Sequence, residues 1–257
     1  MRGTAGSVAE DGAGHAAVLL IVDITEREQA EQQRQEFTAN VSHELKTPLT
    51  SIMGYAEIIE AGIAKPTDVV PFAGKIRTEA QRLLSLIEDI IRLSQLDAGG
   101  EEIPFEPIEL QPLCCTVRSR LQSKADRLGL KIECAGENAT VSGQRRTLEQ
   151  MVFNLADNAL AYNRPNGSVT IETGTDSDGA PFVRVSDTGI GIAPADQKRV
   201  FERFYRVDKS HSKMTGGTGL GLSIVKHGAA LHGAALTLDS TLNVGTRITL
   251  TFPKNRK

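Results

Sequence analysis

Two stretches of the chain place apolar residues at helical steps, and the break between them limits how the chain can pack. The second stretch has steps of three and four, which is typical of helices that pack along an apolar seam. The first stretch has the same spacing. The break at Gly62–Pro66 predicts a turn between two helices. The predicted seam residues are Val41, Leu45, Pro48, Ile52, Tyr55 and Ile59 in the first helix and Leu83, Leu86, Ile90 and Leu93 in the second.

The expected product is a helical hairpin. A polar, helix-forming segment at 26–36 leads into the first helix, and the second helix is expected from about Pro71 to Asp97, ended by Gly99-Gly100. Two seamed helices alone bury too little apolar surface for a stable core. Two copies would make a four-helix bundle, so we expect a homodimer.

Residues 103–257 have a mixed pattern that predicts a separate α/β domain. Strands and helices do not alternate strictly, so an α/β sandwich with a mixed sheet fits better than a doubly wound parallel sheet. The predicted class is therefore α+β, a helical hairpin followed by an α/β sandwich. The expected strands are 130–134, 168–173, 182–186, 235–239 and 246–252, and the expected helices are 113–128, 146–162 and 220–231.

The first residues are harder to place. Residues 1–14 are rich in Gly, Ala, Ser and Glu, and we expect them to be mobile. The apolar segment Ala16–Ile24 reads as one strand. Because one strand cannot form a sheet alone, it is either the last strand of a domain or an arm that pairs elsewhere.

Composition excludes several classes of partner. The net charge is −3, so no basic field draws the chain to nucleic acid or anionic lipid. The longest apolar run, Ala16–Val22, has seven residues, whereas a membrane-spanning helix needs roughly 20. The three cysteines form no C-x-x-C pair. We therefore expect reduced thiols and a cytoplasmic location.

The segment Ser42–Leu49 could carry chemistry. His43 lies off the predicted seam and should face solvent, with Thr47 one turn later on the same face and Glu44 adjacent. Pro48 has no N–H, so the helix can bend below His43. An exposed imidazole beside a carboxylate suits a histidine nucleophile whose proton the carboxylate accepts. A surface histidine on an amphipathic helix explains the pattern as well.

Two amides lie one turn apart on a predicted helix. Asn154 and Asn158 share a helix face, and Asn is a poor residue in a helix interior. Their side-chain carbonyls could hold Mg²⁺ or its waters beside phosphates. Ordinary core or surface amides are the simpler interpretation.

Two glycine-rich segments follow strand-like or polar residues. Asp187 comes after a predicted strand, and Gly189 and Gly191 would let the backbone approach a flat ligand. Gly216–Leu222 opens the helix 223–231, where backbone amides could cradle a phosphate. No Gly-Lys-Ser/Thr follows and no βαβ unit surrounds it, so it is neither a P-loop nor a dinucleotide fingerprint.

Between these segments, residues 201–206 precede a polar stretch, 207–215, that has few apolar anchors and contains Lys209 and Lys213. This composition is what a mobile lid over a polyphosphate would need.

The order and spacing of these motifs resemble the sensor histidine kinase family of two-component systems, over residues 36–253. The resemblance implies a dimerisation and phosphoacceptor hairpin at 37–100 and, at 103–257, an ATP-binding domain of the gyrase/chaperone ATPase type. Residues 1–25 then look like the closing strand of a PAS-like sensor domain, joined by a signalling helix at 26–36. The matching motifs are FTANVSHELKTPL (37–49), NLADNA (154–159), DTGIGI (187–192), FERFYR (201–206) and GGTGLGL (216–222).

By resemblance, the chain would autophosphorylate with ATP and pass the phosphoryl group to an aspartate of a response regulator receiver domain. His43 would accept the γ-phosphoryl group, and Glu44 would act as its base. Thr47 would help to place a water for the reverse phosphatase reaction, and Arg206 would stabilise the transferring charge. The chain would be the cytoplasmic end of a longer, membrane-anchored or soluble receptor.

The resemblance also implies the nucleotide site. Asn158 would ligate Mg²⁺, Asn154 would line the phosphate site, and Asp187 would bind the adenine amine in a pocket shaped by two glycines. The other implied site residues are Gly189, Gly191, Tyr162, Gly217, Gly219, Leu220 and Gly221.

Two departures from the family pattern matter. Ala161 stands where the family often has a phosphate-contacting lysine, and Gln144 stands where an acidic residue is usual, which looks structural. An ATP hydrolase is disfavoured because relatives that hydrolyse ATP use a carboxylate at the position of Asn154. A non-catalytic nucleotide-binding scaffold is favoured only by Ala161. Of the other histidines, His227 and His232 are expected to be packing or surface residues.

Overall fold

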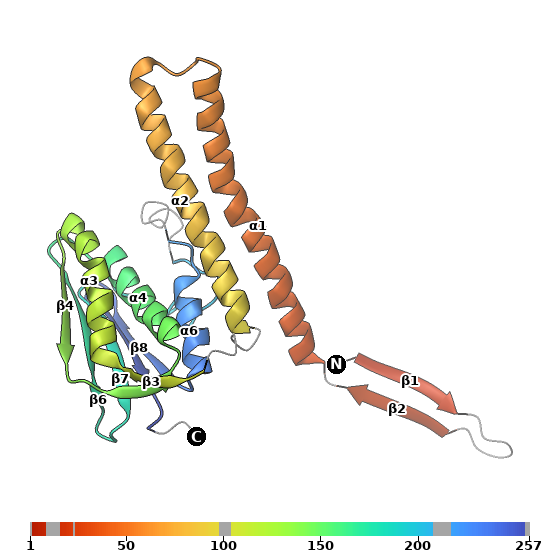
Figure 1. Cartoon of the computed structure of the whole chain (residues 1–257). Coiled ribbons are helices and arrows are strands. Elements are labelled where there is room, and N and C mark those ends of the chain that lie inside the picture. Colours follow the sequence, from red (N-terminus) through yellow and green to blue (C-terminus); the bar gives the residue numbers. More distant parts are fainter. Residues whose placement is uncertain (1, 9–15, 23, 98–103, 208–216, 255–257) are drawn as a thin grey trace.

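The computed structural model describes residues 2–8, 16–22, 24–97, 104–207 and 217–254. These residues form a two-stranded ribbon, a pair of long helices and a layered α/β domain (Figure 1). The predicted lid residues 208–215 and the Gly99-Gly100 helix stop lie outside the described residues. So do His15 and His211.

The N-terminal ribbon corrects the prediction of mobility for Arg2–Val8. Strand β1 (Arg2–Val8) pairs antiparallel with β2 (Ala16–Val22), with Arg2 opposite Val22. The partner that β2 needs for its backbone N–H and C=O groups is the preceding segment of the same chain. Arg2–Val8 is thus a strand rather than a mobile segment, and it gives β2 a partner; whether β2 closes a larger sensor domain stays a prediction.

The helical hairpin confirms the seam prediction. Helix α1 (Thr25–Glu60) runs without interruption through the polar segment 26–36, and α2 (Pro66–Asp97) returns beside it (Figure 1). All the predicted seam residues are buried or half-buried. Helix α2 begins at Pro66 rather than near Pro71, because a proline fits the first turn of a helix. Pro71 lies within the second turn and deprives only the Thr67 carbonyl of its helical donor.

The α/β domain contains the predicted mixed sheet. The strand order is β4-β6-β7-β9-β8, with β4 and β6 parallel and the other pairs antiparallel. Helices α3, α4 and α6 pack on one side of this sheet. The elements are α3 (Leu110–Leu128), β4 (Lys131–Gly136), α4 (Arg145–Ala161), β6 (Ser168–Thr175), β7 (Pro181–Asp187), α6 (Gly221–Leu231), β8 (Ala235–Thr241) and β9 (Gly245–Thr251).

Two short strands were not predicted. Strand β3 (Glu106–Glu109) precedes α3 in the chain, and β5 (Thr140–Gly143) follows β4. The two strands pair antiparallel. Each has only four residues, and β3 buries only Ile108, so the apolar pattern is too short to distinguish these strands from loops. Their pairing fixes the start of α3 and the start of α4.

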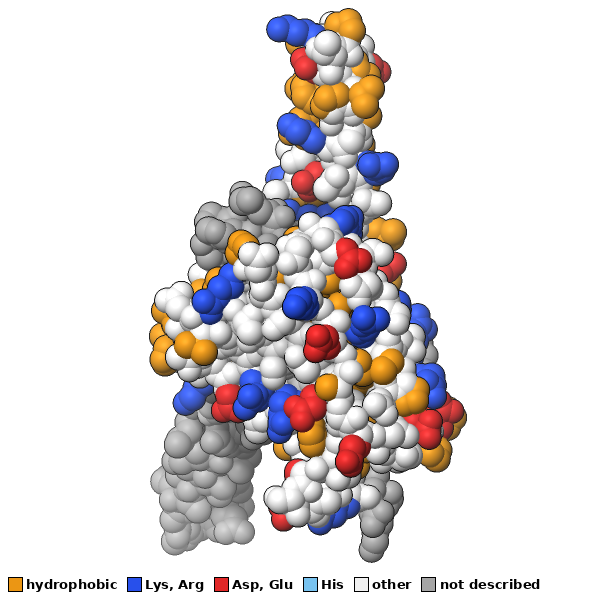
Figure 2. Space-filling model, turned by 90° about the vertical axis from the view of Figure 1, so that its left-hand side faces the viewer, with side chains coloured by type: hydrophobic (Ala, Val, Ile, Leu, Met, Phe, Trp, Pro, Cys, Tyr) orange, Lys and Arg blue, Asp and Glu red, His pale blue; other side chains and the backbone are white. Residues whose placement is uncertain are grey.

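The surface of the hairpin differs from that of the α/β domain. Figure 2 shows lysine, arginine and acidic side chains interspersed over the α/β domain, whereas apolar side chains gather toward the end of the hairpin. Among the described residues, no helix combines the length and the apolar character that a bilayer span requires. Cys114, Cys115 and Cys134 are free thiols, and Cys114 is buried, as expected.

His232 ties the end of α6 to the start of α4. The ring is buried at 1% exposure, and its Nε2 accepts the Gln144 backbone N–H at 3.0 Å. Since Nε2 accepts, Nδ1 carries the proton and donates to the Gly228 carbonyl at 2.8 Å. His232 is a packing residue, as predicted. Gln144 is also buried, which agrees with a structural role.

We predict that His232→Leu destabilises the α/β domain, because the Gln144 N–H loses its acceptor in a buried position. An unpaired buried N–H costs roughly 1–3 kcal/mol, so the midpoint of urea unfolding should fall. Lys226→Leu on the exposed face of α6 is the control and should leave the midpoint nearly unchanged. Equal midpoints for His232→Leu and the wild type would contradict the assignment.

Candidate functional site

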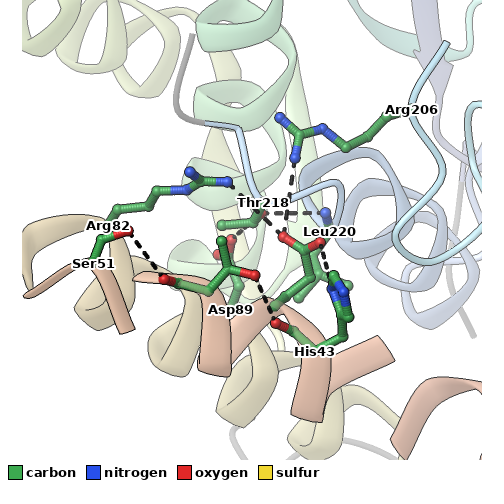
Figure 3. Close-up of polar contacts among 9 residues, drawn as sticks. His43, Ser51, Arg82, Asp89, Arg206, Thr218 and Leu220 are labelled. Atoms are coloured by element: carbon green, nitrogen blue, oxygen red, sulfur yellow. Dashed lines mark hydrogen bonds and ion pairs between the residues drawn. The ribbon is translucent and has the colours of Figure 1, made fainter. Parts of the chain in front are cut away.

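His43 projects from α1 into solvent, as its position off the seam predicted. Its side chain is 80% exposed, and its Nδ1 lies 3.9 Å from Glu44 Oε1. The Thr47 hydroxyl, one turn later, donates to the His43 carbonyl at 3.2 Å (Figure 3). Pro48 lies inside α1 and is buried in the seam. The imidazole is therefore accessible to a group approaching from outside the hairpin.

Glu44 is the point where the charges of the two domains meet. Its Oε2 lies 3.9 Å from Arg82 Nη2 on α2 and 4.0 Å from Arg206 Nη1 in the α/β domain (Figure 3). These separations allow electrostatic attraction and are too long for hydrogen bonds. The sequence analysis missed Arg82, which carries no motif of its own.

Arg206 is largely buried and only partly satisfied. Its side chain is 11% exposed, and its Nε and Nη2 have no hydrogen-bond partner among the described residues. Burial lowers the pKa of the guanidinium, which nevertheless stays protonated. These two buried nitrogens of a cation carry unpaired N–H groups, which are the donors that an anionic group would satisfy.

An apolar cluster joins the α/β domain to the hairpin. Leu220 and Ile224, at the start of α6, are buried against Leu86 and Leu93 of α2. Helix α6 accordingly lies beside the lower part of α2 (Figure 1). Phe204 extends the cluster and stacks near Phe37 of α1, with ring centroids 5.7 Å apart.

A polar contact fastens the glycine-rich segment to the same helix. The Thr218 hydroxyl donates to Asp89 Oδ2 of α2 at 2.8 Å and accepts the Leu220 N–H at 3.2 Å (Figure 3). Burial raises the pKa of Asp89, and the Thr218 hydrogen bond opposes this shift. Sequence reasoning missed Asp89 because its partner is 129 residues away.

The two predicted asparagines differ in their surroundings. Asn154 is buried: its Nδ2 donates to the Gly221 carbonyl at 3.1 Å and its Oδ1 accepts from Gln150 at 2.9 Å. Asn158 faces the same glycine, and its Nδ2 would lie 3.8 Å from a Cβ added there. The described residues give the Asn158 side chain no hydrogen bond. Asn154 therefore holds α6 on α4, while the amide of Asn158 is available.

The segment that follows β7 is held tightly. Asp187 Oδ1 accepts the Gly189 N–H at 2.8 Å and the Thr246 N–H at 3.2 Å. In the described part of the chain, its Oδ2 accepts no hydrogen bond. Burial raises the pKa of Asp187, and the backbone hydrogen bonds lower it. Asp187 therefore presents one carboxylate oxygen that is free to accept a bond.

Both glycines after Asp187 are required by close backbone approach. A Cβ at Gly189 would lie 2.3 Å from the Tyr162 carbonyl, and one at Gly191 would lie 2.1 Å from the Thr241 carbonyl. Gly191 also has a φ of 68°, which disfavours other residues. The segment thus fits between the end of α4 and the end of β8, beside the half-exposed Tyr162.

These groups suit a nucleoside triphosphate bound with Mg²⁺. Asn158 offers an uncommitted amide oxygen, of the ligand type that Mg²⁺ takes. Arg206 offers unpaired donors for phosphate. At Gly217 an added Cβ would meet nothing within 4 Å, and Gly219 has a φ of 74°. The glycine-rich segment therefore leaves open space at Gly217, a few residues before the start of α6.

Two family profiles match this chain and together cover most of it. The His Kinase A (phospho-acceptor) domain matches residues 33–99, and the Histidine kinase-, DNA gyrase B-, and HSP90-like ATPase matches residues 143–256. The chain is 40% identical over 240 residues to the sensor-like histidine kinase SenX3 of Mycolicibacterium smegmatis, covering 93% of this chain and 62% of SenX3. The chain belongs to the sensor histidine kinases.

Other similar proteins belong to the same family. The sensor histidine kinase WalK of Bacillus subtilis is 34% identical over 247 residues, covering 95% of this chain and 40% of WalK. The chain thus spans about three fifths or less of the length of these relatives. The crystal structure of histidine kinase ThkA in complex with response regulator protein TrrA has a TM-score of 0.66 over 98% of this chain and 75% of ThkA. At 20% identity, this likeness shows the fold.

The domain limits given by the resemblance remain predictions for this chain. Neither profile reaches residues 1–25, and the PAS-like assignment of that segment stays a prediction as well. The hairpin followed by an α/β sandwich is confirmed.

We predict that Asp89→Asn tightens the contact between the glycine-rich segment and α2 at neutral pH. Because the folded-state pKa of Asp89 is raised, the contact is more stable with the carboxyl protonated, and that stability is lost as the pH rises through the raised pKa. Asparagine keeps an oxygen that can accept from Thr218 without burying a charge. Hydrogen exchange of residues 217–224 should slow a few-fold in the variant.

The matched control is Glu79→Gln, about three turns earlier on α2 and not among the charges that act on Asp89, which should leave exchange unchanged. The difference between Asp89→Asn and the wild type should vanish in acid, where Asp89 is protonated. Faster exchange in Asp89→Asn at neutral pH would show that the charged carboxylate stabilises the contact.

Proposed function

We propose that this chain binds ATP with Mg²⁺, phosphorylates His43, and passes the phosphoryl group to an aspartate of a response regulator receiver domain. The observation that carries the proposal is the meeting of the two domains at the histidine. Arg206 of the α/β domain reaches Glu44 beside the exposed His43. A small movement of the α/β domain would therefore bring a phosphoryl donor bound to it against His43.

The nucleotide would be held by residues from three elements. Asp187 would accept the adenine amine with its free oxygen, in the pocket shaped by Gly189 and Gly191, flanked by Tyr162. Asn158 would ligate Mg²⁺, which when bound offsets phosphate charge. The triphosphate would lie along Gly217, Gly219, Leu220 and Gly221, at the positive end of the α6 dipole. Asn154 would support this wall through its bond to Gly221.

The chemistry at His43 follows from the direction of its ring. Nδ1 faces Glu44, so Glu44 would hold the Nδ1 proton and leave the Nε2 lone pair facing outward as the nucleophile. Nε2 would form the bond to phosphorus as the bond to the ADP oxygen breaks. Arg206 would stabilise the negative charge of the group in transfer.

The same site serves the reverse reaction toward the regulator. Thr47 lies one turn from His43, and its hydroxyl oxygen keeps a lone pair while it donates to the helix. It would hold a water for hydrolysis of the aspartyl phosphate. We propose the cytoplasm as the location of these reactions.

Apolar residues on the hairpin support a homodimer. Leu49 and Met53 of α1 are 48% and 54% exposed, and Leu84 and Ile91 of α2 are 58% and 53% exposed. These side chains lie outside the seam between α1 and α2. A second hairpin would cover them in a four-helix bundle.

Hydrolysis of ATP by water is disfavoured by the surroundings of Asn154. This amide is committed to Gly221 and Gln150, and it cannot act as a base toward water. A nucleotide-binding scaffold without transfer has one residue in its favour, Ala161, which removes a phosphate contact that the family often has. Labelling with γ-labelled ATP distinguishes phosphoryl transfer to His43 from a scaffold that only binds the nucleotide.

We predict that incubation with γ-labelled ATP and Mg²⁺ gives an acid-labile, base-stable phosphate on the wild-type chain. His43→Gln should abolish the label because it removes the only proposed nucleophile. His227→Gln on α6 is the control and should retain most of it. Label that persists in His43→Gln would disprove the site, and an unlabelled wild type that still binds ATP would favour the scaffold.

We predict that Ala161→Lys tightens ATP binding by roughly 3- to 10-fold, since a lysine there adds a charge-assisted phosphate contact. Calorimetric titration with a non-hydrolysable ATP analogue measures this. Ala161→Gln, of similar length without the charge, should change the affinity little. An unchanged dissociation constant in Ala161→Lys would show that phosphate is held elsewhere.

A further inference from the structure

One arginine that belongs to none of the motifs binds three backbone carbonyls. Arg164 lies in the turn after α4, and its Nε donates to the Thr188 carbonyl at 2.7 Å and the Gly189 carbonyl at 3.2 Å. Its Nη2 donates to the Gly189 carbonyl at 3.0 Å and to the Asn243 carbonyl. A single guanidinium therefore joins the segment after β7 to the turn between β8 and β9.

The bond to Thr188 reaches Asp187 through one peptide group. The Thr188 carbonyl and the Gly189 N–H belong to the same peptide plane, and that N–H donates to Asp187 Oδ1 at 2.8 Å. A cation at the carbonyl end and a carboxylate at the N–H end polarise the peptide in the same direction. The positive charge of Arg164 also lowers the pKa of Asp187, against the burial that raises it.

The Asn243 contact fixes the turn that carries the second donor to Asp187 Oδ1. The Asn243 N–H donates to the Ile190 carbonyl at 2.7 Å, and the Thr246 N–H donates to Asp187 Oδ1 at 3.2 Å. Arg164 binds both the 188–189 peptide and the Asn243 carbonyl. It therefore fixes the relative positions of the two groups that donate to Asp187 Oδ1, the Gly189 N–H and the Thr246 N–H. The direction of the free Oδ2 then depends on Arg164.

We propose that Arg164 is a positioning residue for base recognition, which orients Asp187 Oδ2 toward an exocyclic amine and so selects ATP over purine triphosphates that lack that amine. The inference rests on the proposed ATP binding. Inosine triphosphate is the natural probe because it carries a carbonyl oxygen where ATP carries the amine. An oriented carboxylate accepts from the amine and repels the carbonyl, whereas a mobile one can turn away from it.

The experiment compares the dissociation constants of ATP and inosine triphosphate, each with Mg²⁺, for the wild type and Arg164→Ala. We expect ATP binding to weaken about 10-fold and inosine triphosphate binding by less than about 3-fold, so that discrimination falls. The control is Arg145→Ala, an arginine of the same domain that is 57% exposed and lies 3.6 Å from Glu106. It should change neither constant.

A second variant keeps the test informative if Arg164→Ala does not fold, as judged by thermal unfolding. Arg164→Lys keeps the charge but lacks the planar fork that reaches three carbonyls. Its discrimination should lie below that of the wild type. Unchanged discrimination in a folded Arg164 variant, or equal weakening of both nucleotides, would overturn the inference and leave a merely structural role.

The Asp187→Asn background separates Arg164 from other contacts with the base. Asp187→Asn should itself lose most of the discrimination, and adding Arg164→Ala should then leave the ratio of the two constants unchanged. A further fall in the ratio would show that Arg164 acts by another route and would overturn the inference. A wild type that binds neither nucleotide would overturn the proposed function and this inference together, whereas failure of the Arg164 prediction alone leaves ATP binding intact.

Discussion

The packing of Leu220 against α2 is the interaction on which the arrangement of the site depends. Leu220 lies at the end of the glycine-rich segment and is fully buried with Leu93, and burial of one such side chain contributes roughly 1.5–3 kcal/mol. His43 and Glu44 belong to the hairpin, whereas Arg206 belongs to the α/β domain. The packing of Leu220, together with the hydrogen bond from Thr218 to Asp89, brings Arg206 close to His43 and Glu44.

Two carboxylates in the site are controlled by cations that come from other elements. Glu44 lies between Arg82 of α2 and Arg206, so its availability to His43 depends on where the α/β domain sits. Asp187 is held through a peptide group by Arg164. In both cases the carboxylate is a recognisable motif residue, and a cation that acts on it, Arg82 or Arg164, lies outside the motifs.

The sequence predicted what depends on local spacing and missed what depends on distant contacts. The seam at Leu86 and Leu93 and the exposure of His43 follow from helical periodicity, and both are confirmed. The pairing of Arg2–Val8 with β2 was missed because small residues give no strand periodicity. Asp89 and Arg164 carry no local signal either, since each acts on a segment far along the chain. The roles of the site residues themselves came from resemblance and remain proposals.

The most direct test of this account is the distance between the hairpin and the α/β domain in solution. Spin labels at the exposed positions Gln81 of α2 and Lys226 of α6, diluted with unlabelled chain, report it by pulsed electron paramagnetic resonance. The contact around Leu220 predicts a single narrow distance distribution in the nucleotide-free chain. A broad distribution would show that the α/β domain is not held on α2, and would contradict the account.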